Sequence, residues 1–171
     1  MTDHKANDQG SQFSGIGAPA DLGPRVLARL IDYVILWAVF LVILFPVFLA
    51  LSFLGSIGGV VGGGFSLGSL VFGIIVAALV VGYFAIMESQ RGQTVGKMVM
   101  GLETQGPNGG KPTTEEAVKR NVWNALNVIP ILGGLLLLGA SIYIMVTINQ
   151  SPTKTGWHDE FAGGTKVIKI K

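Results

Sequence analysis

Three charged residues lie where a long apolar stretch begins, a place at which charge is costly. Arg25, Arg29 and Asp32 fall within about 60° of one another on a helix that turns 100° per residue, so they share one face. A carboxylate entering a bilayer needs a partner, and these guanidinium groups are the nearest cations. Two interpretations stay open. Either the arginines anchor the chain to lipid phosphates while Asp32 offsets their charge, or Asp32 faces a cavity and titrates or binds a ligand.

Histidine and carboxylates adjoin in the sequence His158-Asp159-Glu160 near the end of the chain. A metal site normally takes three or four ligands, and the other histidine is His4 in the N-terminal tail, so we expect no metal and no other cofactor. The chain has no cysteine, which excludes disulfides, thiolate zinc sites and thiol nucleophiles. We expect Asp159 to cap a short helix, or to meet Arg25 or Lys97.

A glycine-containing segment is similar to a phosphate-binding loop in composition but not in spacing. Its residues are Gly92, Gln93, Thr94, Val95, Gly96 and Lys97. A Walker A loop has four residues between its glycines and Ser or Thr after the lysine, whereas here there are three and Met98 follows. We therefore expect a tight turn entering a strand over 97–104, with Lys97 at the membrane surface. No serine lies beside a base that could activate it, so we predict that the chain is not an enzyme.

The elements that must position these residues are apolar helices. Half of the residues are hydrophobic, 13% are charged and the mean hydropathy is +0.58, against about 25% charged in soluble domains. Positions 33–54 and 66–87 carry no formal charge, and a helix over either is about 33 Å long, enough for a hydrocarbon core of about 30 Å. A chain of 171 residues is too short to bury two such helices. We predict membrane spans, with a kink at Pro46.

The third apolar region, 121–149, is either one span or a helical hairpin that turns at 130–134. All Lys and Arg residues fall before position 32, within 91–120, or after 150. Cytoplasmic segments attract Lys and Arg, and only a hairpin places all of these on one side. A strand predicted over 165–170 would also need to lie on the same side as its partner strand. We therefore prefer the hairpin, with both termini cytoplasmic.

The predicted fold class is an all-α integral membrane bundle with two full transmembrane helices, a C-terminal helical hairpin (or third span) and a short pair of cytoplasmic strands. The spans are expected at about 30–54, 66–87 and 121–149. They belong to one membrane domain, 24–171, which follows a disordered cytoplasmic tail over 1–23. Between the second and third regions, Thr113 or Thr114 is predicted to cap a helix that starts at Glu115.

Three motifs together resemble the RDD family of bacterial membrane proteins. They are GPRVLARLIDYVIL at 23–36, ESQRGQTVGKMVMGLE at 88–103 and TGWHDEFAGGTKVI at 155–168, in the order of the family. The resemblance implies that Arg25, Asp32 and Asp159 occupy the three positions for which the family is named. It implies supporting positions for Arg29, Gly92, Gln93, Thr94, Gly96, Lys97 and His158. The chain departs from the family's pattern at Glu160-Phe161, at an extra Gly164 and at Met98, and each signature residue is retained.

The resemblance implies a multi-pass protein of the bacterial plasma membrane, and two functions stay open. One is transport of a small ligand or ion, because ionisable groups inside a membrane commonly mark functional sites. The alternative is a non-catalytic accessory or scaffold subunit of a larger membrane complex. The expected partners are the lipid bilayer with its anionic headgroups, and further copies of the chain or a larger membrane complex. No nucleic acid and no cofactor are expected.

Overall fold

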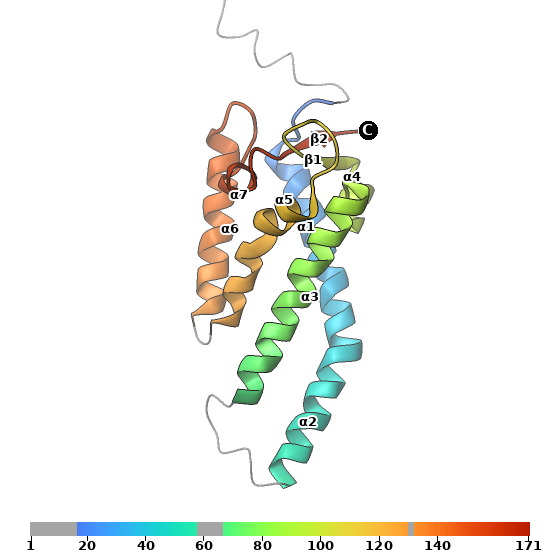
Figure 1. The fold of residues 1–171 in the computed structure, drawn as a ribbon, viewed down its shortest axis with the longest axis vertical. Coiled ribbons are helices and arrows are strands. Elements are labelled where there is room, and N and C mark those ends of the chain that lie inside the picture. The colour runs from blue at the N-terminus through green and yellow to red at the C-terminus, as the bar shows by residue number, and fades with distance from the viewer. Residues whose placement is uncertain (1–16, 58–66, 130–131) are drawn as a thin grey trace, which may run out of the picture.

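The computed structural model describes residues 17–57, 67–129 and 132–171. Most of these residues are helical, and a two-stranded sheet lies at one end of an elongated molecule (Figure 1). Within these described ranges, three helical segments are long and apolar enough to cross a membrane: Leu22–Ala50, Val71–Arg91 and Gly133–Gln150. These segments overlap the three regions predicted from the sequence, and the mostly helical fold class is confirmed.

The first of these segments is a continuous helix with a local change of winding. Helix α1 (Leu22–Val39) runs into a π-helical turn, η1 (Phe40–Leu44), and then into α2 (Phe45–Ile57). Pro46 follows this turn and has no N–H with which to close a regular helical bond. At Phe45, the N–H donates to the carbonyl five residues back. The irregularity predicted at Pro46 therefore takes the form of a π turn just before it.

Helix α3 (Leu67–Arg91) is followed by a short helix, α4 (Val95–Met100). The strand predicted from Lys97 is wrong over this part of the chain. The Thr94 hydroxyl caps α4 by accepting from the N–H of Lys97, and Gly101 ends the helix in the left-handed conformation at φ +65°. Because α4 is capped at both ends, this short segment is helical, although its alternation of apolar residues is typical of a strand.

The sheet joins a segment from the middle of the chain to one near its C-terminal end. Strands β1 (Leu102–Gln105) and β2 (Lys166–Lys169) pair antiparallel, which confirms the predicted strand pair with a later start for β1. Residues 17–20 lie along the other side of β2, where the N–H groups of Gly17 and Ala20 donate to its carbonyls. The disordered tail predicted over 1–23 therefore does not include this stretch, because backbone pairing needs no apolar side chains. Residues 1–16 lie outside the described residues.

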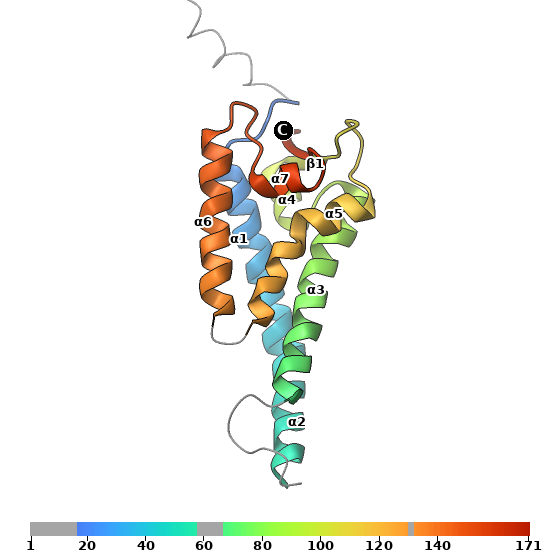
Figure 2. The same cartoon turned by 60° about the vertical axis from the view of Figure 1, so that its left-hand side comes forward.

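The third apolar region reverses direction between positions 128 and 133, and positions 130 and 131 of the predicted turn lie outside the described residues. Helix α5 (Thr114–Asn121) continues as a 3-10 helix, η2 (Val122–Val128), and α6 (Gly133–Gln150) returns beside η2 (Figures 1 and 2). A Cβ on Gly133 would lie 2.7 Å from the Leu126 carbonyl oxygen, so the close approach of α6 to η2 needs glycine. A one-turn helix, α7 (Trp157–Phe161), then leads to β2.

The start of α5 confirms the predicted cap. Thr113 accepts from the N–H of Glu116, and the Glu116 side chain accepts from the N–H of Thr113, so the two residues form a capping box. This geometry fixes the start of a helix that carries Arg120 and Asn121 on its buried side.

Buried side chains concentrate at the sheet end of the bundle. Two small apolar clusters lie there, formed by Ala20, Ala28, Leu102 and Val167, and by Trp123, Ile144 and Ile148. The other buried side chains in this region are largely polar or charged. A polar interior at one end of an otherwise apolar bundle makes this end the candidate site.

Candidate functional site

One face of α1 carries the charged residues singled out by the sequence. Arg25, Ala28 and Asp32 are buried and follow one another at three- and four-residue spacings, as one stripe of a helix requires. Ala28 and Asp32 of this stripe lie against α4. The helical geometry predicted for Arg25 and Asp32 is confirmed, but the structure does not pair these two charges with each other. Each bonds to a different segment.

Asp32 is held by three donors from the far end of α3 and the start of α4. The Tyr83 hydroxyl donates to Oδ1 at 2.9 Å and the Thr94 hydroxyl donates to Oδ2 at 2.6 Å. The N–H of Gly96 donates to Oδ1 at 2.8 Å. The carboxylate therefore meets the N-terminal end of α4, where free N–H groups and the helix dipole favour a negative charge.

The contact between α1 and α4 depends on small residues. A Cβ added to Gly96 would overlap the carbonyl oxygen of Ala28 and lie 3.0 Å from the carboxyl carbon of Asp32. Glycine at position 96 therefore lets its own N–H reach Asp32. Because the obstacle is backbone, a side-chain rotation cannot make room for a larger residue.

Glu88 and Lys97 form a second centre, at the end of α3. The Lys97 ammonium donates to the Glu88 carboxylate and to the Thr104 hydroxyl. The other Glu88 oxygen accepts from the Asn121 amide at 3.0 Å and lies 3.5 Å from the Nε of Arg120. The position of Lys97 at the membrane surface stays a prediction. Its side chain is buried within the protein, where Glu88 and Thr104 accept its hydrogen bonds.

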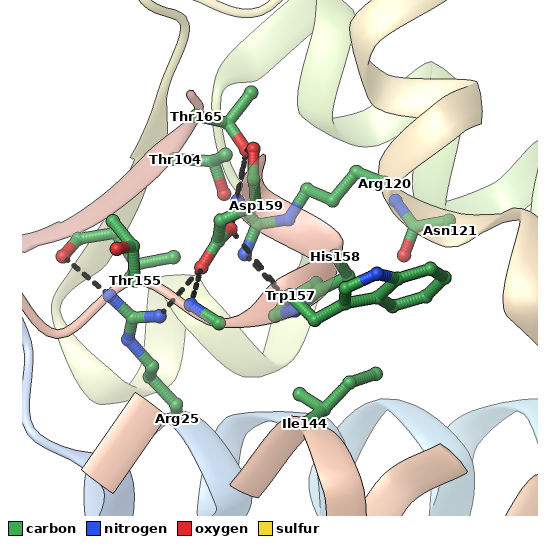
Figure 3. Close-up of polar contacts among 12 residues, drawn as sticks. Arg25, Thr104, Arg120, Asn121, Ile144, Thr155, Trp157, His158, Asp159 and Thr165 are labelled. Carbon is green, nitrogen blue, oxygen red and sulfur yellow. Dashed lines mark hydrogen bonds and ion pairs between the residues drawn. The ribbon is translucent and has the colours of Figure 1, made fainter. Parts of the chain in front are cut away.

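Asp159 forms a third centre, and it joins segments that are far apart in the chain (Figure 3). Its carboxylate lies 3.2 Å from Nη1 of Arg25 and 2.6 Å from Nη1 of Arg120. It also accepts from the N–H of Gly156 at 3.0 Å and from the Thr165 hydroxyl at 3.2 Å. The predicted contact with Arg25 is confirmed. Asp159 also stabilises the start of α7, although from within the first turn.

Arg120 connects the second and third centres. Its Nε faces Glu88 and its Nη1 faces Asp159, so a single guanidinium bridges two carboxylates. Arg25 adds a further connection, because its Nη2 donates to the backbone carbonyl of Val167 in β2 at 3.2 Å. The charged groups thus form one network that ties α1, α3, α4, α5, α7 and the sheet together.

The environment shifts the pKa of the network's groups outside the candidate spans. Burial lowers the pKa of Lys97 to about 8, although the Glu88 carboxylate opposes this effect. Burial lowers the pKa of His158 to about 3, so its imidazole is neutral at neutral pH. Burial acts to raise the pKa of Asp159, but the charge of Arg120 outweighs it and holds that pKa below its ordinary value.

Arg29 lies at the edge of the network, against aromatic rings. Its guanidinium carbon is 3.8 Å from the centre of the Phe84 ring and 5.2 Å from that of Trp123. Both of its terminal nitrogens donate to the Asn121 side-chain oxygen at 3.1 Å. Stacking on aromatic faces keeps an arginine charged while reducing its contact with water.

A cavity of about 230 Å³ lies beside this network, between α1, η2 and α6. Its apolar lining includes Ile144 and Ile148, and its charged lining consists of Arg25, Arg29, Asp32, Glu88, Lys97 and Arg120. Within the described parts of the chain, no group of three or more His, Asp or Glu residues could hold a metal ion. The cavity therefore offers hydrogen-bond donors at one side and hydrocarbon at the other.

Comparison with known proteins decides the family. The model of the RDD family matches residues 19–163, from the segment beside β2 to two residues past the end of α7. The chain belongs to the RDD family. It is 27% identical over 143 residues to the uncharacterized membrane protein YteJ of Bacillus subtilis (strain 168), covering 84% of this chain and 77% of YteJ. No solved structure matches the chain.

The second motif of this RDD protein can be explained position by position. Gly92 has φ +70° and turns the chain after α3, and Gln93 donates to the carbonyl of Leu102 at 2.8 Å. Thr94 both caps α4 and donates to Asp32, and Gly96 and Lys97 make the contacts described above. In the closing motif, His158 is buried against Arg120, with 3.4 Å between Nε2 and Nη2.

Several central residues of this RDD protein were not predicted from its sequence. They are Tyr83, Glu88, Thr104, Arg120, Asn121 and Thr165. A signal existed for two of them: Glu88 is the first charge after the second uncharged stretch, and Arg120 directly precedes the third apolar region. The rule applied to Asp32, that a charge entering a span needs a partner, applies equally to these two. The hydroxyl and amide side chains carried no comparable signal.

Proposed function

We propose that this RDD protein is a non-enzymatic membrane transporter that binds a small ligand in the cavity between α1, η2 and α6. The observation that carries the proposal is the lining of this cavity, which combines arginine side chains with apolar residues of two candidate spans. Ligand sites commonly pair an apolar wall with a few fixed polar groups. Asp32 enters this proposal as a structural residue, because three donors already occupy its carboxylate.

The proposed arrangement in the bacterial plasma membrane has two full spans and a C-terminal hairpin, with the sheet end in the cytoplasm. Strands β1 and β2 form the sheet and residues 17–20 bond to the other side of β2, so the segments before the first helical region, after the second and after the third lie together at one end. The basic residues of positions 91–120 and after 150 then face the cytoplasm, in agreement with the preference of Lys and Arg for that side. Anionic lipid headgroups are the proposed partners of this basic end, and no nucleic acid is invoked.

Cysteine labelling tests this arrangement, because the chain has no cysteine of its own. Single cysteines replace Gly59, Asn108 and Lys169 in intact cells, which are treated with an impermeant thiol reagent. We expect labelling from outside at position 59 and protection at 108 and 169. Labelling at 169 together with protection at 108 would contradict the hairpin and support a single third span.

Flux measurements test transport itself. The purified protein is reconstituted in proteoliposomes and challenged with gradients of protons, sodium, potassium and inorganic phosphate, and with a fluorescent phosphatidylglycerol whose inner-leaflet fraction is read by dithionite quenching. We expect one of these probes to move faster than in empty liposomes. Ser141→Phe, which places a ring in the cavity, is expected to reduce that movement. Its matched control is Ile142→Phe, because Ile142 is exposed and does not line the cavity.

The accessory or scaffold function is the second candidate, and one observation favours it. The carboxylates of Asp32, Glu88 and Asp159 are all engaged within the chain, as a rigid docking module would require. If no probe moves above the level of empty liposomes, transport is refuted. Recovery of a fixed larger complex in mild detergent, with no flux, would support the scaffold function instead.

A further inference from the structure

Three buried N–H groups beside the cavity have no acceptor among the described residues. They are Nε of Arg25, Nε1 of Trp123 and Nδ1 of His158. All three residues line the cavity, and each is more than nine-tenths buried. A buried donor without an acceptor is destabilising, and native proteins contain few of them. Three in one cavity indicate that an acceptor belongs there.

The assignment of His158 as a donor follows from its neighbour. Arg120 has only donors, and its Nη2 lies 3.4 Å from Nε2 of His158. The Oδ1 of Asp159 lies farther from Nε2, at 3.7 Å. With Nε2 as the acceptor of the nearer Arg120, the proton of the neutral imidazole lies on Nδ1. The unpartnered atom of His158 is thus an N–H, like those of Arg25 and Trp123.

The formal charges around the cavity leave a surplus of one positive charge. The four cations are Arg25, Arg29, Lys97 and Arg120, the three carboxylates are Asp32, Glu88 and Asp159, and His158 is neutral. Four positive charges less three negative charges leaves one. Arg29 is the cation of this set that forms no ion pair with a carboxylate among the described residues, and it is partly buried. A single anion in the cavity would balance its charge.

The apolar part of the lining defines the rest of the ligand. Leu30 and Val26 of α1 line the cavity and are 58% and 39% exposed, so the cavity reaches the outer apolar surface of the bundle. On the α6 side the lining includes Ile144, Met145 and Ile148. A volume of about 230 Å³ exceeds that of an engineered cavity of about 150 Å³ that binds benzene, so it holds a small head group and a few methylenes. A longer hydrocarbon chain would leave past Leu30.

We propose that the cavity binds an anionic amphiphile, whose head group accepts hydrogen bonds from Arg25, Trp123 and His158 and whose hydrocarbon chain leaves between α1 and α6. This inference rests on the proposed function, because it names the ligand class of the same cavity. The ligand class is a singly charged head group, such as a carboxylate or a phosphodiester, attached to an apolar tail. A free inorganic anion shares the head-group chemistry but makes no use of the apolar walls.

Native mass spectrometry of the full chain in mild detergent tests the inference, with dioleoylphosphatidylglycerol and dioleoylphosphatidylcholine as probes. We expect the anionic lipid to bind at least tenfold more tightly than the zwitterionic lipid. Inorganic phosphate in millimolar excess should not displace it. Equal affinities for the two lipids, or displacement by phosphate, would overturn the proposal.

A matched pair of variants locates the binding. Trp123→Phe keeps an aromatic ring but removes one of the three donors, and should weaken binding of the anionic lipid roughly tenfold while leaving the zwitterionic lipid unchanged. Trp157→Phe makes the same change outside this cavity and should leave both affinities unchanged. An unchanged affinity in Trp123→Phe would overturn the proposed site. Equal melting temperatures of the two variants verify that both are folded.

The outcomes of this experiment and of the flux assay are separable. Specific binding of the anionic lipid without flux of any probe supports the inference and refutes transport. Flux of a probe without preference for the anionic lipid refutes the inference and supports transport. Binding is measured at equilibrium in detergent, so it does not depend on movement across a bilayer.

Discussion

Replacing Gly96 by alanine gives the sharpest test of how α4 is held against α1. The added Cβ would overlap the Ala28 carbonyl oxygen, so the two segments must separate and the hydrogen bond from Gly96 to Asp32 must lengthen. Overpacking costs about 1–3 kcal/mol, and losing a hydrogen bond to a charged group costs about 1.5–3 kcal/mol. We therefore expect the free energy of unfolding to fall by about 3 kcal/mol or more.

Thermal unfolding in detergent measures this effect. In a chain of this size about 1 kcal/mol changes the Tm by about 2–4 °C, so we expect the Tm of Gly96→Ala to fall by about 6–12 °C. Gly139→Ala is the matched control, because Gly139 lies in α6 and nothing is within 4 Å of its added Cβ. This control should match or exceed the wild type, since alanine favours helix over glycine.

A double variant distinguishes a backbone clash from a side-chain clash. Ala28→Gly removes a methyl group from α1 but leaves the carbonyl oxygen in place. The structure therefore predicts no recovery of the Tm when Ala28→Gly is added to Gly96→Ala. Full recovery, or a Gly96→Ala protein as stable as the Gly139→Ala control, would refute the packing described for α1 and α4.

Three further outcomes are expected. Glu88→Gln should lower the free energy of unfolding by about 3–5 kcal/mol, because it leaves the Lys97 ammonium without its carboxylate partner. Adding Lys97→Met should recover part of this loss, and additive effects in the double-mutant cycle would contradict the pairing. Acidification from pH 7 to 5 should lower the free energy of unfolding by up to about 2 kcal/mol. The pKa of His158 is about 3 in the folded chain and 6.5 in the unfolded chain, so the unfolded chain binds more protons over this pH range. The same pH dependence in the chemical denaturation of His158→Gln would contradict this assignment to His158. Thr113→Ala should cost about 1 kcal/mol by removing the cap of α5, and an unchanged denaturation midpoint would count against that cap.

The sequence was sufficient where a single helix determined the outcome. Spacing alone placed Arg25 and Asp32 on one face, and the cap of α5 was narrowed to Thr113 or Thr114 because a capping residue acts on its own neighbours. The lengths of the apolar stretches likewise predicted the candidate spans.

The partners of the charged residues could not be predicted from the spacing within one helix, because these partners are distant in the sequence. Asp32 and Thr94 are 62 positions apart, and periodicity within α1 carries no information about α4. Helix α4 itself has six residues, less than two turns, so its apolar alternation was interpreted as a strand. The burial of Lys97 depends on Glu88 and Thr104, which only the tertiary fold brings together.

The contact between Arg25 and Asp159 also orders the assembly of the protein in time. The two residues are separated by 134 positions, and at roughly 5–20 residues per second the ribosome needs about 7–27 s to pass from one to the other. During that interval Arg25 has been synthesised but the carboxylate that it will bind has not. Synthesis interrupted before α7 leaves the guanidinium groups of Arg25 and Arg120 without Asp159, so an incomplete chain lacks the contact that closes the fold.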